Sequence, residues 1–225
     1  MHKQLSAKEI NENIHEHMEE IHKEFRDGFE ELKKYTKSVT IFGSSHSTPA
    51  SPHYRQAQEL AYRIAKELQY TVITGGGPGI MAAANLGAME ANGNSVGFTI
   101  YLPNEQHKNA YLTSDIGFRY FFTRKTMLTF SAEAFVFFPG GYGTFDELFS
   151  IITLIQTGKI PKTPIILVGK DFWKELRNFM YSHMLEKHHA ISQSDLELFV
   201  ITDNTDKVIE IIKGAPVSKW WEQLD

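Results

Sequence analysis

The chain has 225 residues, a formal net charge of −4 and 42% hydrophobic residues, which is enough for one substantial core and typical of a globular protein. This mildly acidic balance provides no general attraction to nucleic acid or to an anionic membrane. Cysteine is absent, so disulfides, zinc–thiolate sites, iron–sulfur clusters and a cysteine nucleophile are excluded. No stretch approaches the ~18 apolar residues of a membrane helix, and the first residues lack the apolar core of a secretory signal, so a cytoplasmic location is expected.

Residues 1–36 are predicted to form an N-terminal amphipathic helix, and residues 37–225 a single domain. Ser6 and Glu9 have the spacing of a capping box at a helix start. Apolar residues then recur at steps of three and four, which places them on one stripe of a helix reaching about Tyr35: Ile10, Ile14, Met18, Ile21, Phe25, Phe29 and Leu32. We favour a helix that lies across the main domain over a dimer seam, the alternative that these heptad-like steps leave open.

Strands and helices alternate through the rest of the chain. Strands are predicted at 38–42, 70–74, 95–101, 134–138, 164–168 and 198–202, and helices at 52–68, 80–91, 121–130, 144–156, 172–187 and 206–213. Residues 102–117 are expected to be a polar connection. This alternation predicts an α/β fold with one parallel sheet and helices on both faces. Trp220 and Trp221 are expected to pack on the body of the protein or on another subunit.

Three of the predicted strands end in turns of small residues, after Phe42, Thr74 and Phe138. Ligands of open parallel sheets bind outside the carboxyl ends of the strands, where following helices direct free N–H groups and a positive dipole end. Glycine in such turns lets the backbone approach a ligand closely. Tight connections need glycines too, but three such turns at one sheet edge favour a phosphate-bearing ligand.

Two nucleotide-binding motifs fit the turns less well. Gly77, Gly79 and Ala82 nearly match the dinucleotide pattern G-x-G-x-x-A, but the next strand, at 95–101, offers no carboxylate for a ribose. A dinucleotide is therefore disfavoured. A P-loop is excluded because its motif is absent.

The third turn carries the most chemistry. Gly140, Gly141 and Gly143 can cradle phosphate oxygens, and the Thr144 hydroxyl can donate to them or cap the helix. Glu147 is equally compatible with a catalytic carboxylate and with the second half of a Thr144 capping box.

A basic pair, Arg124 and Lys125, lies in the helix that precedes the strand leading into this turn. The alternative is a solvated basic face. The neighbouring aromatic residues, from Phe118 to Phe122, make a generic charged surface the weaker interpretation.

These residues resemble the LOG (Lonely Guy) family of cytokinin riboside 5′-monophosphate phosphoribohydrolases. Residues 139–147 match the family pattern P-G-G-x-G-T-x-x-E, residues 75–81 resemble G-G-G-x-G-[LI]-M, and residues 43–45 resemble G-S-S. Arg124 and Lys125 stand at the family's R-K position. The resemblance runs from about Ser38 to Val168.

The resemblance implies a Rossmann-like, doubly wound homodimer that cleaves the N-glycosidic bond of AMP-type nucleotides to free base and ribose 5-phosphate. It implies Arg124 and Glu147 as catalytic residues and the following substrate-binding residues: Gly43, Ser44, Gly76, Gly77, Lys125, Gly140, Gly141, Gly143 and Thr144. It implies no metal and no cofactor. Met127 departs from plant-like members near the base, so a preference for N6-modified adenine is left open.

The implied chemistry suits these side chains, since departure of a purine leaves an oxocarbenium-like ribose that a carboxylate stabilises. Members are often labelled lysine decarboxylases, but the chain shows no sign of a pyridoxal-phosphate lysine site. The alternative function is a non-catalytic nucleotide or molybdenum-cofactor carrier of similar fold, which would need the glycines but not the Arg124–Glu147 pair. Single-stranded DNA binding is disfavoured by the acidic balance.

Overall fold

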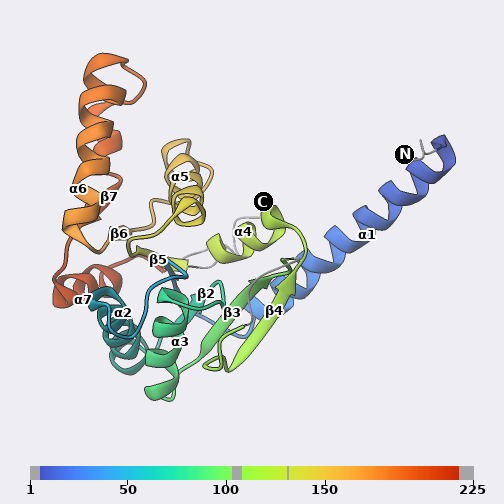
Figure 1. Ribbon diagram of the computed structural model, residues 1–225, viewed down its shortest axis with the longest axis horizontal. Coiled ribbons are helices and arrows are strands. Elements are labelled where there is room, and N and C mark those ends of the chain that lie inside the picture. The colour runs from blue at the N-terminus through green and yellow to red at the C-terminus, as the bar shows by residue number, and fades with distance from the viewer. Residues whose placement is uncertain (1–5, 103–107, 131, 218–225) are drawn as a thin grey trace.

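The computed structural model describes residues 6–102, 108–130 and 132–217. A single seven-stranded parallel sheet forms the centre of the molecule, with strand order β4-β3-β2-β1-β5-β6-β7 (Figure 1). The strands are β1 (Ser38–Phe42), β2 (Thr71–Thr74), β3 (Ser95–Ile100), β4 (Ser114–Phe118), β5 (Ala132–Phe137), β6 (Ile165–Leu167) and β7 (Phe199–Ile201). Among the described residues, no helix combines the length and apolar character needed to cross a bilayer.

Helices cover both faces of the sheet, as predicted. One face packs on α2 (Pro52–Arg63), α3 (Ile80–Glu90) and α7 (Thr205–Lys213). The other packs on α4 (Phe121–Thr129), α5 (Tyr142–Gln156), α6 (Lys170–Phe179) and the end of α1 (Ala7–Leu32). With both faces covered, the central strands β1, β2 and β5 are buried at every position, which explains why they are mainly apolar.

The prediction of a polar connection at 102–117 was wrong for the last residues of this segment. Residues 114–118 form β4, which pairs with β3 from Ser114 opposite Val96 to Phe118 opposite Ile100. This strand lies at the edge of the sheet, where only Phe118 is fully buried. An edge strand needs no apolar run, so its sequence lacks the usual signal.

Two of the predicted helices change from α-helix to π-helix near their C-terminal ends. The last residues of the helices predicted at 52–68 and 172–187 are π-helical, at Ile64–Leu68 and Met180–Lys187. A short 3₁₀ helix follows at Gln193–Glu197. The other predicted helices and strands are present, with boundaries that shift by one or two residues, except that α1 ends at Leu32 instead of about Tyr35.

Helix α1 begins with the predicted capping box. The Glu9 N–H donates to the Ser6 hydroxyl at 3.3 Å, and the Ser6 N–H donates to the Glu9 carboxylate at 2.8 Å. The helix ends at Leu32, and only its second half lies on the domain, while the first half projects away from it (Figure 1). Ile10, Ile14 and Met18 are therefore exposed. The dimer-seam alternative for this half stays a prediction, and Trp220 and Trp221 lie outside the described residues.

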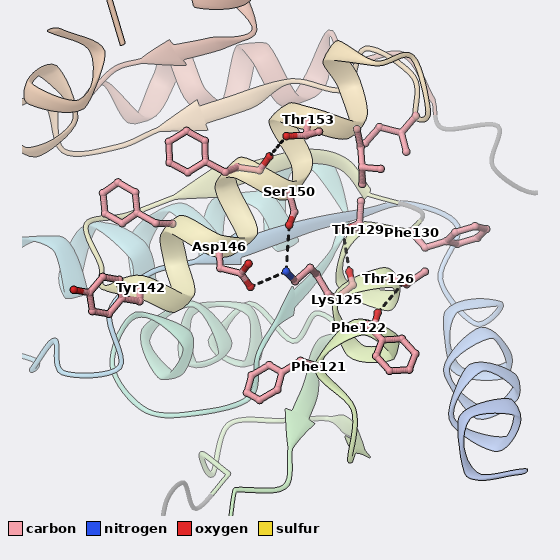
Figure 2. Close-up of a pocket in the computed structure, with 14 residues that line it drawn as sticks. Phe121, Phe122, Lys125, Thr126, Thr129, Phe130, Tyr142, Asp146, Ser150 and Thr153 are labelled. Carbon is pink, nitrogen blue, oxygen red and sulfur yellow. Dashed lines mark hydrogen bonds and ion pairs between the residues drawn. The ribbon is translucent and has the colours of Figure 1, made fainter. Parts of the chain in front are cut away.

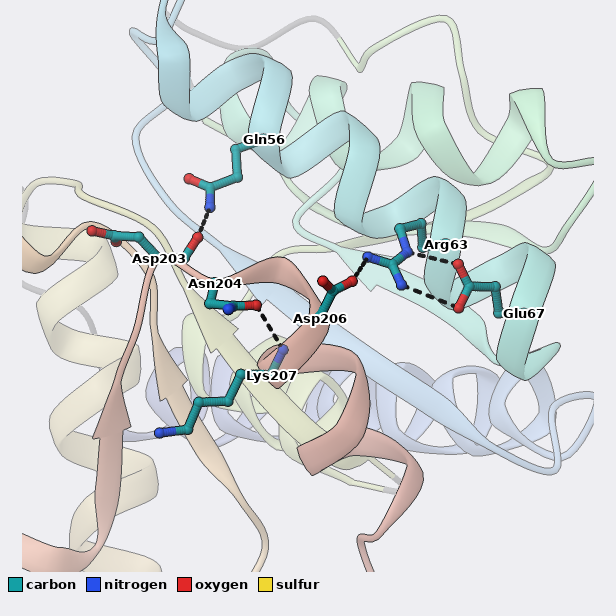
Figure 3. Close-up of polar contacts among 7 residues, drawn as sticks. All are labelled: Gln56, Arg63, Glu67, Asp203, Asn204, Asp206 and Lys207. Carbon is teal, nitrogen blue, oxygen red and sulfur yellow. Dashed lines mark hydrogen bonds and ion pairs between the residues drawn. The ribbon is translucent and has the colours of Figure 1, made fainter.

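Polar contacts tie α7 and the loop before it to α2 (Figure 3). Arg63 bonds to Glu67 at 2.6 Å and to Asp206 of α7 at 2.7 Å, while the Gln56 amide donates to the Asp203 carbonyl at 2.8 Å. Asn204 caps α7 by accepting from the Lys207 N–H. Exposed ion pairs contribute at most about 1 kcal/mol each, so these contacts orient α7 while its apolar face stabilises it.

Candidate active site

A cavity of about 430 Å³ opens at the carboxyl ends of three neighbouring strands, β2, β1 and β5. Strands β2 to β4 add to one side of β1, and strands β5 to β7 add to the other side. The point between β1 and β5 is therefore a topological switch point, which is the usual ligand position in an open α/β sheet. Seven of the residues expected at the site line this cavity: Gly43, Ser44, Arg124, Gly141, Gly143, Thr144 and Glu147.

The first glycine turn is bonded to the other two. The Ser44 N–H donates to the Pro139 carbonyl at 3.0 Å, and the Ser44 carbonyl accepts from the Ile80 N–H at 3.0 Å. Gly79 has φ +70°, and a Cβ there would lie 2.2 Å from the Ser44 oxygen. Glycine is thus required at position 79, because a side chain there would push the first and second turns apart.

The second turn reaches the cavity through Gly75. Gly76 and Gly77 do not line the cavity but bind Asn109, whose N–H and side-chain amide donate to their carbonyls at 2.9 and 3.0 Å. A Cβ at Gly75 would lie 2.2 Å from Nη2 of Arg124. The missing side chain at Gly75 therefore makes room for the arginine.

The third turn starts α5 earlier than predicted. The helix begins at Tyr142 with Gly141 as its N-cap, which places Thr144 in the first turn without a capping bond. The capping-box interpretation of Thr144 and Glu147 is therefore not observed. Gly140 does not line the cavity, and the Thr144 hydroxyl occupies the space next to it, 2.1 Å from where a Cβ would be.

Gly141 and Gly143 differ from the other glycines of the three turns. A Cβ at either position would meet no atom within 4 Å, and neither residue has a positive φ. Packing of the protein itself therefore does not require glycine at these two positions. Both open into the cavity at the N-terminus of a 15-residue helix.

Glu147 is the buried acid of the site. Its side chain is 8% exposed, and its Oε2 atom has no hydrogen-bond partner. Burial raises the pKa of Glu147 to about 7, and the nearby charges of Arg124 and Lys125 only partly oppose this shift. A carboxyl with this pKa can exchange a proton at neutral pH.

Arg124 reaches the cavity from the first turn of α4. Its Nε donates to the carbonyl of Phe98 in β3 at 2.6 Å. Burial lowers the pKa of Arg124, and the Glu147 carboxylate opposes this effect. The two expected catalytic side chains thus come from different helices and influence each other across the cavity.

Lys125 points away from this cavity. Its Nζ lies 2.7 Å from Asp146 and donates to the Ser150 hydroxyl at 3.2 Å, within a second groove of about 1170 Å³ between α4 and α5 (Figure 2). Phe121, Tyr142 and Asp146 line both the cavity and the groove. The groove is mainly aromatic and aliphatic, and we call it the α4–α5 groove; its apolar lining is Phe121, Phe122, Phe130, Tyr142, Phe145, Phe149, Leu154 and Ile160.

Sequence reasoning missed several lining residues, among them Gly75, Met81, Ile100 and Leu102. Gly75 belongs to a motif that was recognised, so its position after Thr74 was an available signal. Met81 ends the same motif, whereas Ile100 and Leu102 carried no signal, because an apolar residue in a cavity wall looks like any core residue. In the described part of the chain, no group of three or more histidine, aspartate or glutamate side chains converges as a metal site would require.

Comparisons with known proteins agree on one family. A sequence profile described as "Possible lysine decarboxylase" matches residues 81–212. The cytokinin riboside 5′-monophosphate phosphoribohydrolase LOG2 of Arabidopsis thaliana is 25% identical over 189 residues, which cover 82% of this chain and 86% of that protein. The enzyme of that name from Rhodococcoides fascians is 26% identical over 149 residues, covering 64% of this chain and 74% of that protein.

Solved structures share the fold. The molybdenum cofactor carrier protein of Chlamydomonas reinhardtii superposes with a TM-score of 0.59 at 21% identity, covering 79% of this chain and 96% of that one. The molybdenum cofactor binding protein of Rippkaea orientalis gives 0.54 at 20% identity, covering 79% and 94%. These two show the architecture alone. Since the family profile spans more than half of the chain, the protein belongs to the family described as possible lysine decarboxylases, the LOG family that its glycine motifs resemble.

Proposed function

We propose that the protein hydrolyses the N-glycosidic bond of AMP-type nucleoside 5′-monophosphates, including N6-modified ones, to free base and ribose 5-phosphate. The observation that carries this proposal is Glu147, a buried carboxyl with an unpartnered oxygen in a cavity that also holds Arg124. A buried acceptor without a partner is costly, and such groups concentrate at functional sites. The relatives named as phosphoribohydrolases support the same reaction.

The N-terminus of α5 is the proposed 5′-phosphate site. Free N–H groups and the positive dipole end of a helix bind anions, and Gly141 and Gly143 leave this helix end open to the cavity. Thr144 lies in the same turn and adds a hydroxyl. The phosphate would thus anchor the ribose close to Glu147, one turn further along the helix.

The remaining walls suit a purine base. Met81, Ile100, Leu102 and Phe121 line the cavity, and its volume falls within the ~300–1,000 Å³ of small-molecule sites. In the reaction the bond from C1′ to the base nitrogen breaks, and its electron pair leaves with the base. Water then adds its oxygen to C1′, one proton passes to the base, and the ionised Glu147 stabilises the positive charge at C1′. Arg124 stabilises the departing base or orients the phosphate.

The direct test is incubation with AMP and with N6-isopentenyl-AMP, followed by chromatography for released base and ribose 5-phosphate. We expect turnover by the unmodified protein and loss of at least about 10²-fold in Arg124→Ala and Glu147→Ala variants that remain folded. Tight nucleotide binding without turnover would instead support the carrier alternative, which the fold shared with molybdenum cofactor carriers keeps open.

We also propose that two copies associate through the α4–α5 groove. Phe121, Phe122 and Tyr142 are 56%, 50% and 97% exposed, which is unusual for aromatic residues gathered on one surface. Because Phe121 and Tyr142 also border the catalytic cavity, a second copy seated here would narrow its mouth.

Light scattering coupled to size-exclusion chromatography tests the dimer. The unmodified protein should elute as a dimer, and Phe122→Glu should dissociate it, because a charge cannot be buried in an apolar interface. Phe179→Glu is the matched control, since Phe179 is 52% exposed on α6 outside the groove. A monomeric unmodified protein would refute the proposal. The cytoplasmic location and the absence of a nucleic-acid partner stay predictions.

A further inference from the structure

Helix α4, which carries Arg124, begins without a cap of its own. Its N-cap residue, Tyr120, makes no side-chain capping bond, and its first turn contains no acidic residue. Arg124 and Lys125 follow near this end. Positive charges near a helix N-terminus oppose the helix dipole, so the start of α4 needs a negative group from elsewhere.

Glu24 of α1 supplies that group. Its side chain is 6% exposed, and its carboxylate accepts the Arg119 N–H at 2.5 Å and the Tyr120 N–H at 3.4 Å. It also accepts a short hydrogen bond from the Thr123 hydroxyl. A residue almost one hundred positions away in the sequence thus caps α4 immediately before Arg124.

The two helices also pack closely beyond this cap. Gly28 lies one turn after Glu24, and a Cβ there would be 2.5 Å from the Met127 sulfur of α4. The rings of Phe29 and Phe130 meet edge to face at 4.8 Å. Helix α1 therefore supports α4 from its first turn to its last.

The position of α4 determines where Arg124 reaches. The Arg124 N–H donates to the Tyr120 carbonyl at 3.2 Å in the turn that Glu24 caps. Its side chain extends past Gly75 to the carbonyl of Phe98 in β3. A shift of α4 away from the sheet would withdraw the guanidinium from the cavity.

We propose that Glu24 is a positioning residue for Arg124, and that the N-terminal helix serves the active site by holding α4 in place. This inference rests on the proposed function, in which Arg124 is catalytic. It gives the second half of α1 a role in turnover in addition to its role in stability.

The test compares two buried glutamates of α1. Glu24→Gln removes the charge that caps α4. Glu31→Gln alters the other buried glutamate of the helix, whose carboxylate accepts hydrogen bonds from Ser114 of β4 at 2.6 Å and from Lys34 and Tyr35. Small misplacements of catalytic groups cost large factors in rate, so we expect Glu24→Gln to lower kcat and kcat/KM together by about tenfold with little change in KM. Glu31→Gln should lower Tm without changing kcat. Equal kcat losses in both variants, or none in Glu24→Gln, would overturn the inference.

A second readout does not depend on activity. The Nε–H of Arg124 is hydrogen-bonded to the Phe98 carbonyl, so the Nε proton should exchange slowly with water. The exchange rate is measured from the ¹H–¹⁵N NMR signal of this group, which is assigned with an Arg124→Lys variant. Exchange should accelerate in Glu24→Gln and stay slow in Glu31→Gln. If Glu24→Gln does not fold, Thr123→Val removes one donor to the same carboxylate and should produce the smaller change in the same direction. Absence of base release by the unmodified protein would refute the proposed function, whereas unchanged Arg124 exchange would refute this inference.

Discussion

Replacing Glu147 by glutamine is expected to reduce base release at least about a hundredfold and, above pH 7, to make the protein harder to unfold. Loss of a carboxyl that stabilises charge and transfers protons lowers turnover by about 10²–10⁴-fold. The stability gain has a separate cause. Burial raises the pKa of Glu147 from 4.5 to about 7, so the folded state holds this proton more tightly than the unfolded chain does.

The pH dependence of this effect has a definite direction. Below pH 4.5 the carboxyl is protonated in both states and does not oppose folding. As the pH rises from 4.5 to 7, the unfolded chain ionises first, and the free energy of unfolding falls until it levels above pH 7. The penalty at that plateau is on the order of 3 kcal/mol. Urea denaturation should therefore show that Glu147→Gln gains on the order of 2 kcal/mol over the unmodified protein between pH 5 and pH 8.

Glu31 provides a control of opposite sign. Burial pushes its pKa upward, but hydrogen bonds from Lys34, Ser114 and Tyr35 outweigh that effect and hold the pKa below its usual value. Its contribution to stability is present at neutral pH and is lost as the pH falls. Glu31→Gln should thus be least stable, relative to the unmodified protein, at neutral pH. If the stability difference from the unmodified protein had the same pH dependence in both variants, the raised pKa assigned to Glu147 would be contradicted.

Gly143→Ala is expected to strengthen the fold and weaken nucleotide binding. Gly143 is the second residue of α5, and an added Cβ would meet no protein atom within 4 Å. Alanine at such a helical position stabilises a protein by about 0.5–1 kcal/mol, because it restricts the unfolded chain. The same methyl group would project into the cavity beside the proposed phosphate site. We expect calorimetry to show a Kd for AMP about a hundredfold higher, equivalent to about 2.7 kcal/mol.

The other end of the same helix offers a matched glycine. Gly158 also has no atom within 4 Å of an added Cβ, but its φ is +68°. Gly158→Ala should therefore destabilise the protein by about 1 kcal/mol, because an L side chain is strained in this conformation, and leave AMP affinity unchanged. An unchanged affinity in Gly143→Ala would show that phosphate does not bind at this helix end.

Local patterns predicted most of the fold. The capping box of Ser6 and Glu9 and the strand–glycine–helix order depend on residues close together in the chain, so they could be identified without knowing the tertiary structure. Strand β4 was missed because an edge strand is defined by its pairing with β3, and its own sequence carries little apolar signal.

The sequence by itself determined the parallel sheet, the positions of the three glycine turns and the residue types that gather at the carboxyl-end edge of the sheet. Only the tertiary structure distinguished between roles that spacing left equal. In the fold, Glu147 is buried with an unpartnered oxygen instead of forming a capping box, and Lys125 is paired with Asp146. Glu24 of α1 accepts a hydrogen bond at the start of α4, the helix that carries Arg124. The physical reason is that the charge state and orientation of a side chain depend on desolvation and on partners, and folding brings these partners from distant parts of the chain.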